Sequence, residues 1–182
     1  MLWASAMEIR ADATIPFPPE RVFTAYRDRL VELAEFLPNI ASITVLSREE
    51  LAGGDVKLVN EWRGSGSDIP KVARPFLSED KLRWTDHATW HAADFTVDWR
   101  SDVHAFPGAV LSSGKNRFVA AGQGTRLEIR GEIKVDARKI PGVPGLLAGT
   151  VSAAVEKLLG SQVASNATAQ AGGLTRMLQR DG

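Results

Sequence analysis

Apolar and polar residues alternate along seven segments of the chain, which is the pattern of β-strands with one buried face. The cleanest case is residues 125–135, where Leu127, Ile129 and Ile133 share one face and charged residues occupy the other. Such alternation is typical of an antiparallel sheet that is dry on one side and wet on the other. The sequence therefore predicts seven strands, at residues 7–15, 40–48, 55–64, 81–90, 94–103, 110–121 and 125–135.

Apolar residues recur at steps of three and four from Pro144 to about Gly172, which predicts one long amphipathic helix. Pro141 and Pro144 suit its start, and Gly172 and Gly173 are expected to end it, so that residues 174–182 form a tail. At a rise of about 1.5 Å per residue the helix would be roughly 40 Å long and would need an equally long apolar surface. We expect the sheet to supply that surface to a stripe made of Leu147, Val151, Ala154, Val155, Leu158, Leu159, Val163 and Ala167.

Two short helical segments, residues 20–29 and 31–36, are predicted between the first two strands. Pro19 suits a helix start, and Pro38 suits a stop. The resulting order is one strand, two short helices, six strands and one long helix. This order predicts an α+β fold in which a curved seven-stranded sheet wraps around the C-terminal helix.

Composition bounds the class of protein. The 182 residues contain no linker or repeat, which predicts a single domain over residues 1–182. Lys plus Arg equals Asp plus Glu at 22 each, which argues against a nucleic-acid partner. The absence of cysteine excludes disulfides and thiolate metal sites, and suits the cytoplasm. No apolar run approaches the roughly 20 residues of a membrane span, and residues 1–6 lack the basic start of a signal peptide and fit an extension upstream of Met7.

Four of the five tryptophans fall on inward-facing strand positions, namely Trp62, Trp84, Trp90 and Trp99. Indole offers a large apolar body with one N–H donor, which suits the wall of a cavity for a flat or apolar ligand. The same rings could instead simply fill the core. The expected inward wall also contains Phe95, Phe118, Leu127 and Ile129.

Polar residues fall on the same inward faces, at Asn60, Asp86, Ser112 and Asn116. A buried polar group without a partner costs about 1–3 kcal/mol, so each of them needs one. In the functional interpretation they orient the polar end of a ligand, and Asp86 acts as a general base. In the structural interpretation they bond to one another, to helix ends or to trapped water, or a bulge turns them outward.

The remaining candidate chemistry is sparse. His87, His91 and His104 show no metal-binding spacing, and the first two are expected on the solvated outer side of the sheet. Nucleophile-elbow, P-loop, dinucleotide-binding and zinc-protease motifs are absent from the sequence. We expect residues 64–68 to form a Gly/Ser loop and residues 69–77 to form an irregular helical turn. We therefore expect neither a metal nor a cofactor.

Three stretches, together with the order of elements, carry a resemblance to a known family: Pro18-Pro19-Glu20-Arg21-Val22-Phe23, Phe36-Leu37-Pro38 and Ile140-Pro141-Gly142-Val143-Pro144. The chain resembles the START-like, Bet v 1-like superfamily, also called polyketide cyclase/dehydrase-like or helix-grip proteins, and in particular an uncharacterised bacterial branch of it. The resemblance implies a cavity between sheet and helix, but no catalytic residue, because members share none. They include lipid-transfer proteins, hormone and flavonoid binders, aromatase/cyclases and co-chaperone-like modules.

Three functions follow as hypotheses. The first is binding or transport of a hydrophobic small molecule or lipid in the cavity. The second is a cyclase, aromatase or dehydratase that acts on a polyketide-like substrate, with Asp86 as its acid/base. The third is a protein-interaction module with a collapsed core. The sequence does not decide whether the protein forms a homodimer. The expected ligand-binding residues are Asn60, Trp62, Trp84, Asp86, Trp99, Asn116, Phe118, Ile129, Val151 and Val155.

Overall fold

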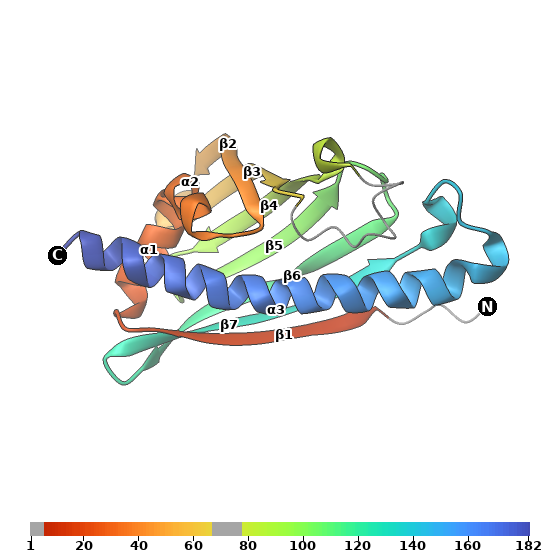
Figure 1. The fold of residues 1–182 in the computed structure, drawn as a ribbon. Helices are drawn as coiled ribbons and strands as arrows, with labels where there is room; N and C mark the ends of the chain where they lie inside the picture. Colours follow the sequence, from red (N-terminus) through yellow and green to blue (C-terminus); the bar gives the residue numbers. More distant parts are fainter. Residues whose placement is uncertain (1–5, 67–77) are drawn as a thin grey trace.

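The computed structural model describes residues 6–66 and 78–182. Within them, all seven predicted strands are present, and they form one antiparallel sheet in the order β1-β7-β6-β5-β4-β3-β2 (Figure 1). The alternating pattern therefore located every strand correctly. The strands are β1 (Met7–Ile15), β2 (Ile40–Glu50), β3 (Val56–Gly64), β4 (Arg83–His91), β5 (Thr96–Val103), β6 (Val110–Ala121) and β7 (Gly124–Val135).

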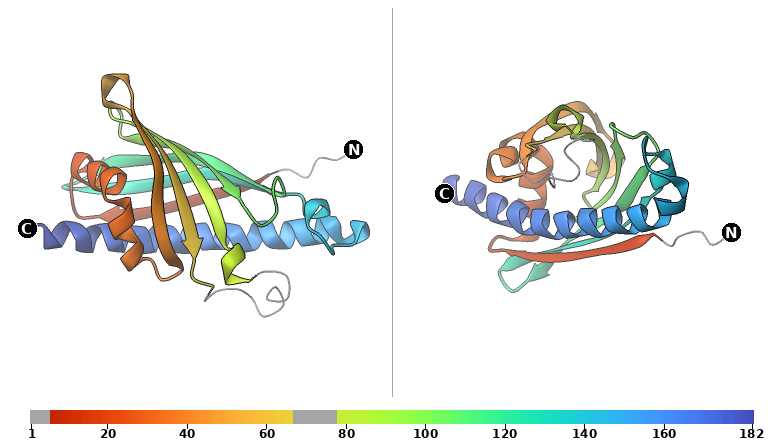
Figure 2. Two further views of the ribbon diagram at one scale, coloured as in Figure 1. Left: turned by 90° about the horizontal axis from the view of Figure 1, so that it is seen from above. Right: turned by 45° about the vertical axis from the view of Figure 1, so that its right-hand side comes forward.

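The sheet curves around the long helix α3 (Ala148–Arg180), which lies along its concave side (Figures 1 and 2). β1 and β2 are the two edge strands, so the chain between them must cross from one edge to the other. It crosses as α1 (Pro19–Asp28), α2 (Leu30–Leu33) and a 3-10 turn at Ala34–Phe36, where two short helices were predicted. The predicted α+β helix-grip architecture is confirmed.

Two strands begin two residues later than predicted. β4 begins at Arg83 because Glu79–Lys81 forms a 3-10 turn. β5 begins at Thr96 because Phe95 has a φ of 52°, which lies in the left-handed region and interrupts the strand. The predicted turn at residues 69–77 lies outside the described residues.

The predicted end of the long helix is wrong. The helix continues through Gly172 and Gly173 to Arg180, so residues 174–182 are not a tail. Leu174, Met177 and Leu178 are almost completely buried, which stabilises the fold by about 1.5–3 kcal/mol for each side chain. This gain exceeds the roughly 1 kcal/mol that a glycine costs inside a helix. In the described part of the chain, no helix combines the length and the apolar character that a membrane span requires.

Gly173 has a packing role that explains why a glycine lies inside the helix. A Cβ atom there would lie 2.7 Å from Leu33 Cδ1 and 2.8 Å from Phe36 Cβ, closer than carbon atoms pack. The missing side chain therefore allows α3 to approach α2 and the 3-10 turn closely. At Gly172, one position earlier, a Cβ atom would meet only the flexible Arg176 side chain, with Nη2 at an ordinary contact distance of 3.8 Å.

The first half of α3 is rotated relative to the predicted stripe. Leu147 and Leu158 are exposed, whereas Ala148, Ser152 and Glu156 are buried. The two polar residues are buried because they satisfy backbone donors where β7 ends. Glu156 Oε1 accepts a hydrogen bond of 2.8 Å from Val135 N, and Ser152 Oγ accepts one of 3.0 Å from Ala137 N.

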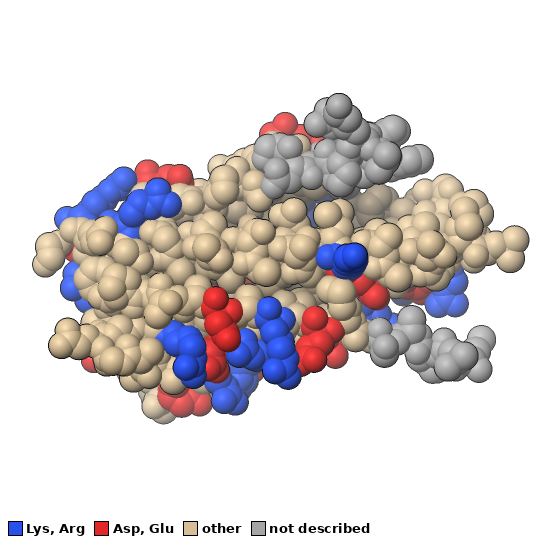
Figure 3. Space-filling model, turned by 60° about the horizontal axis from the view of Figure 1, so that its bottom comes forward, with Lys and Arg blue, Asp and Glu red and all other residues tan. Residues whose placement is uncertain are grey.

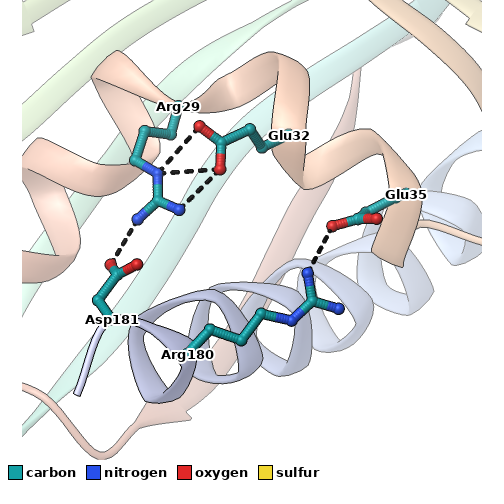
Figure 4. A network of polar contacts seen from close by, with 5 residues as sticks. All are labelled: Arg29, Glu32, Glu35, Arg180 and Asp181. Carbon is teal, nitrogen blue, oxygen red and sulfur yellow. Dashed lines mark hydrogen bonds and ion pairs between the residues drawn. The ribbon is translucent and has the colours of Figure 1, made fainter.

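Ion pairs tie the other end of α3 to the helices that precede β2 (Figure 4). Arg29 pairs with both Glu32 and Asp181, and Arg180 pairs with Glu35 over 2.9 Å. Their side chains are 31% to 63% exposed, so each pair contributes about 1 kcal/mol at most. Apolar burial, rather than charge, therefore holds this end of the helix.

The outer face of β1 and β7 is the wet side of the sheet. Acidic and basic side chains alternate along it in one band (Figure 3), and Arg130 pairs with Asp12 over 2.7 Å across the two strands. The exposed face of α3 is nearly free of charge in the same view. The predicted division into a wet and a dry face is confirmed.

The glycine pair in α3 provides a matched test of this packing. Gly173→Ala should lower the free energy of unfolding by about 1–3 kcal/mol, because the new methyl group overpacks the contact with Leu33 and Phe36. Gly172→Ala should raise it by up to about 1 kcal/mol through helix propensity alone. Urea denaturation of both variants measures the difference, and equal shifts would contradict the close approach of α3.

Candidate functional site

A cavity of about 410 Å³ lies between α3 and the concave face of the sheet. Every strand contributes to its wall, together with α1, α2 and α3. Most of the wall is apolar or aromatic, as in sites for small organic ligands. The wall includes Ile9, Ile40, Trp62, Leu82, Trp84, Ala88, Trp90, Val97, Trp99, Val103, Val110, Ile129, Ile133, Leu159 and Val163.

Two tryptophans form a stacked pair in this wall. Trp62 and Trp84 are direct partners in the β3–β4 register, with ring centroids 5.9 Å apart and ring planes 15° from parallel. Cross-strand partners share a face of the sheet, so both rings point to the cavity side. They provide a flat apolar surface near the end of β3 and the start of β4.

Trp99 lies over two glycines of neighbouring strands. Trp99, Gly114 and Gly131 occupy one register row across β5, β6 and β7. A Cβ atom on Gly114 would lie 2.6 Å from Trp99 Cζ2, and one on Gly131 would lie 3.0 Å from it. The glycines therefore make room for the indole, whose Nε1 donates a hydrogen bond of 2.9 Å to Asn116 Oδ1.

A row of polar residues crosses four strands at the middle of the cavity. Asn60 on β3 is opposite Asp86 on β4, which is opposite Ser101 on β5, which is opposite Ser112 on β6. All four line the cavity. Antiparallel register thus turns four residues that are far apart in sequence into one continuous polar row, which we call the polar row.

Asp86 is the ionisable group of the polar row. It keeps some accessible surface because it faces the cavity, yet protein surrounds it and desolvation raises its pKa to about 7. Ser101 Oγ donates a long hydrogen bond of 3.4 Å to Asp86 Oδ1, and Asn60 lies close by; both act to lower the pKa and only partly offset the burial. The carboxyl group is therefore poised between its neutral and charged forms near neutral pH.

Three buried polar groups in the wall lack hydrogen-bond partners among the described residues. They are the side-chain amide of Asn60 and the Nε1 atoms of Trp62 and Trp90. Asn60 is only 1% exposed, and neither its nitrogen nor its oxygen makes a hydrogen bond of normal geometry. Because each such group costs about 1–3 kcal/mol, the cavity wall holds hydrogen-bonding capacity that a ligand or water can satisfy.

The α3 side of the cavity carries polar residues that the sequence analysis missed. Gln162, Asn166 and Gln170 line the cavity at intervals of four residues, so they share one helix face. Tyr26 also lines it, and its hydroxyl donates a hydrogen bond of 2.8 Å to Gln170 Oε1. Burial raises the pKa of Tyr26 far above its ordinary value, with a smaller effect from the charge of Asp86. The amide spacing beside Leu159 and Val163 was the available signal for this stripe.

Seven of the ten expected ligand-binding residues line the cavity, and a binding role for them stays a prediction. They are Asn60, Trp62, Trp84, Asp86, Trp99, Asn116 and Ile129. The other three do not line it. Phe118 is 3% exposed and packs edge-on against Phe23 in the core, Val155 packs against a second apolar cluster around Ile9 and Ile133, and Val151 lies beyond the cavity, nearer the start of α3. Both valines share a helix face with Leu159 and Val163, which line the cavity, but they lie nearer the start of α3, beyond the end of the cavity.

The histidines lie outside the cavity, on the outward side of the sheet. His91 is not simply solvated, because its ring nitrogens each lie 2.9 Å from a carboxylate, of Asp55 and of Asp98. These carboxylates, Asp55 first, raise the pKa of His91. Among the described residues, no group of three His, Cys, Asp or Glu side chains is arranged to hold a metal ion.

Comparison with known families places the chain. Residues 10–168 match the model of the family described as "Protein of unknown function (DUF2505)". The chain belongs to the DUF2505 family. No curated protein sequence is significantly similar to it. The family assignment agrees with the predicted resemblance to an uncharacterised branch of the START-like superfamily.

Solved structures share the fold of this DUF2505 protein. The protein TTHA0849 from Thermus thermophilus is 22% identical with a TM-score of 0.69, and the match covers 94% of this chain and 99% of that one. The Zhui aromatase/cyclase from Streptomyces sp. R1128 is 15% identical with a TM-score of 0.66, over 97% and 95% of the two chains. A START superfamily protein from Mycobacterium smegmatis is 13% identical with a TM-score of 0.55, over 98% and 100%. At these identities the matches show the START-like fold alone.

The raised pKa of Asp86 makes stability depend on pH. The unfolded chain loses this proton near the ordinary value of 3.8, whereas the folded chain keeps it up to about pH 7. Stability from this group is therefore complete below about pH 4 and is lost as pH rises to about 7, by at most about 4 kcal/mol. Asp86→Asn should abolish this loss.

The measurement is urea denaturation at about pH 4.5, 6 and 8. Asp86→Asn should gain stability relative to the unmodified protein as pH rises. Asp102→Asn, the same change on the outer face of β5, serves as the control and should show no such gain. A constant difference across the pH range would contradict the burial of Asp86.

Proposed function

We propose that this protein binds a small hydrophobic molecule or lipid in the cavity between α3 and the sheet. The observation that carries the proposal is the cavity itself: about 410 Å³, walled by aromatic and aliphatic side chains, with one polar row at its middle. This volume lies within the roughly 300–1,000 Å³ of sites for small ligands. Apolar walls supply affinity through burial, and the polar row fixes orientation.

The comparisons support this proposal at the level of the fold. A START superfamily protein and an aromatase/cyclase have the same architecture, and in both cases the match spans nearly the whole of both chains. A cytoplasmic location, which the cysteine-free sequence suits, is part of the proposal.

A second candidate function is catalysis of a cyclase or dehydratase type on a carbonyl compound. The observation that favours it is Asp86, a carboxyl group inside the cavity whose pKa is raised to about 7. Such a group can take or return a proton near neutral pH, and the neighbouring Asn60 amide can polarise a carbonyl oxygen. Turnover of an enolisable diketone that is lost in Asp86→Asn would support this candidate over simple binding.

A collapsed interaction module is the weakest of the three hypotheses. It requires a cavity below roughly 300 Å³, which the observed volume exceeds. Leu146 and Leu147, 100% and 53% exposed before α3, belong to the exposed apolar surface that such a role would use. Binding inside the cavity explains more of the described wall.

Two adjacent serines on β6 allow a matched test of the proposed site. Ser112 lines the cavity, whereas Ser113 points to the other face of the sheet. The unmodified protein should bind the neutral fluorescent probe N-phenyl-1-naphthylamine, with enhanced probe fluorescence and quenched tryptophan emission. Ser112→Phe fills the cavity and should weaken binding at least about tenfold, which corresponds to about 1.4 kcal/mol.

Ser113→Phe is the control and should bind the probe as the unmodified protein does. Circular dichroism and thermal melting check that both variants remain folded. Equal binding by both variants would place the probe outside the cavity, and the absence of binding to the unmodified protein would contradict the proposed function.

A further inference from the structure

The charges around the cavity restrict the polar end of any ligand. Among the described residues that line the cavity there is no Lys, Arg or His, and the ionisable side chains are those of Asp86 and Tyr26. Both are neutral or negative. A ligand carboxylate or phosphate would therefore lose its hydration, meet no cation among these lining residues and lie near an acidic group.

Asp86 and Asn60 both present acceptor oxygens to the cavity. Ser101 Oγ uses its proton on Asp86 Oδ1, and this long bond of 3.4 Å leaves the carboxyl group able to accept more. Asn60 lies directly opposite Asp86, is 1% exposed, and has no hydrogen-bond partner for its amide oxygen or its amide nitrogen among the described residues. Two adjacent acceptor oxygens, the ionisable one among them, thus face the same space, and the Asn60 amide nitrogen is a neutral donor beside them.

We infer that the cavity selects ligands whose polar end donates hydrogen bonds and carries no negative charge, and that Asp86 and Asn60 determine this selectivity. The inference rests on the proposed binding function and adds the chemical class of the ligand. A hydroxyl group and a protonated amine share this chemistry. The faces of Trp62 and Trp84 are compatible with both, because indole rings pack on apolar groups and also attract cations.

We expect Asp86 to discriminate between ligands, rather than merely to support the fold, because its protonation state changes which polar ligand groups it can bind. When it is neutral, the site accepts a hydroxyl group without burying a net charge. When it is ionised, an ammonium group neutralises it within the cavity. A carboxylate is disfavoured in both states, since neither state offers it a cation.

The experiment uses four probes that share one bicyclic ring: naphthalene, 2-naphthol, 2-naphthylmethylamine and 2-naphthoate. Each displaces N-phenyl-1-naphthylamine from the unmodified protein, from Asp86→Asn and from the outer-face control Asp102→Asn. In the unmodified protein, 2-naphthol should bind at least about tenfold more tightly than 2-naphthoate, as expected for one uncompensated buried charge. In Asp86→Asn this ratio should fall to about threefold or less, because the amide can donate to the carboxylate.

Asp102→Asn should keep the ratio of the unmodified protein, whereas a purely structural role of Asp86 would leave the ratio unchanged in both variants. The pH profile separates the two donors: amine binding should strengthen as pH rises from about 6 to 8, whereas 2-naphthol binding should not. Equal binding of 2-naphthoate and 2-naphthol to the unmodified protein, or the same ratio in Asp86→Asn, would overturn the inference. Failure of every probe, naphthalene included, would instead overturn the proposed function, and the inference with it.

Discussion

The attachment of α3 at two separate places is the constraint on which the cavity depends. At one place, Ser152 and Glu156 accept hydrogen bonds from the backbone where β7 ends. At the other, Gly173 allows close contact with α2, and Leu174 enters the core. Between these places the helix spans the concave sheet without filling it. A helix of 33 residues can do this because its own backbone hydrogen bonds keep it straight.

The sheet contributes the complementary half of the constraint. The glycine pair at Gly114 and Gly131 lets the Trp99 ring lie against the backbone of β6 and β7, so the ring forms part of the wall and leaves space above it. The polar row crosses the same wall in the next inward-facing register row. Asp86 is consequently desolvated and has no cation beside it among the described cavity residues, and this is the basis of the proposed selection by charge.

Much of the fold was readable from sequence because the sheet has one wet and one dry face. Period-two alternation found all seven strands, and it correctly placed Asn60, Trp62, Trp84, Asp86 and Trp99 on the cavity side. The helix was harder to read. The backbone donors at the end of β7 and the close contact at Gly173 determine which face of the helix is buried. These are tertiary contacts, and the periodicity of apolar residues does not predict them.

Position along α3 explains two of the misplaced site residues. Val151 and Val155 share a helix face with Leu159 and Val163 but lie beyond the end of the cavity, whereas Gln162, Asn166 and Gln170 line it farther along the helix. Phe118 faces inward as expected, but the rings of α1 cover it. Prediction of the polar row would have required the register of the strands, which the alternating pattern does not determine. The four residues come from four strands and are neighbours only because every adjacent pair of strands is aligned at that position.

The proposed binding depends on open space between α3 and the tryptophan wall. A crystal structure determined under xenon pressure tests it most directly, because xenon enters apolar cavities and is located by its electron density. Xenon should lie between α3 and the Trp62–Trp84 pair, with the helix attached at Glu156 and at Gly173. Tryptophan rings collapsed into that space, with no xenon bound, would contradict it.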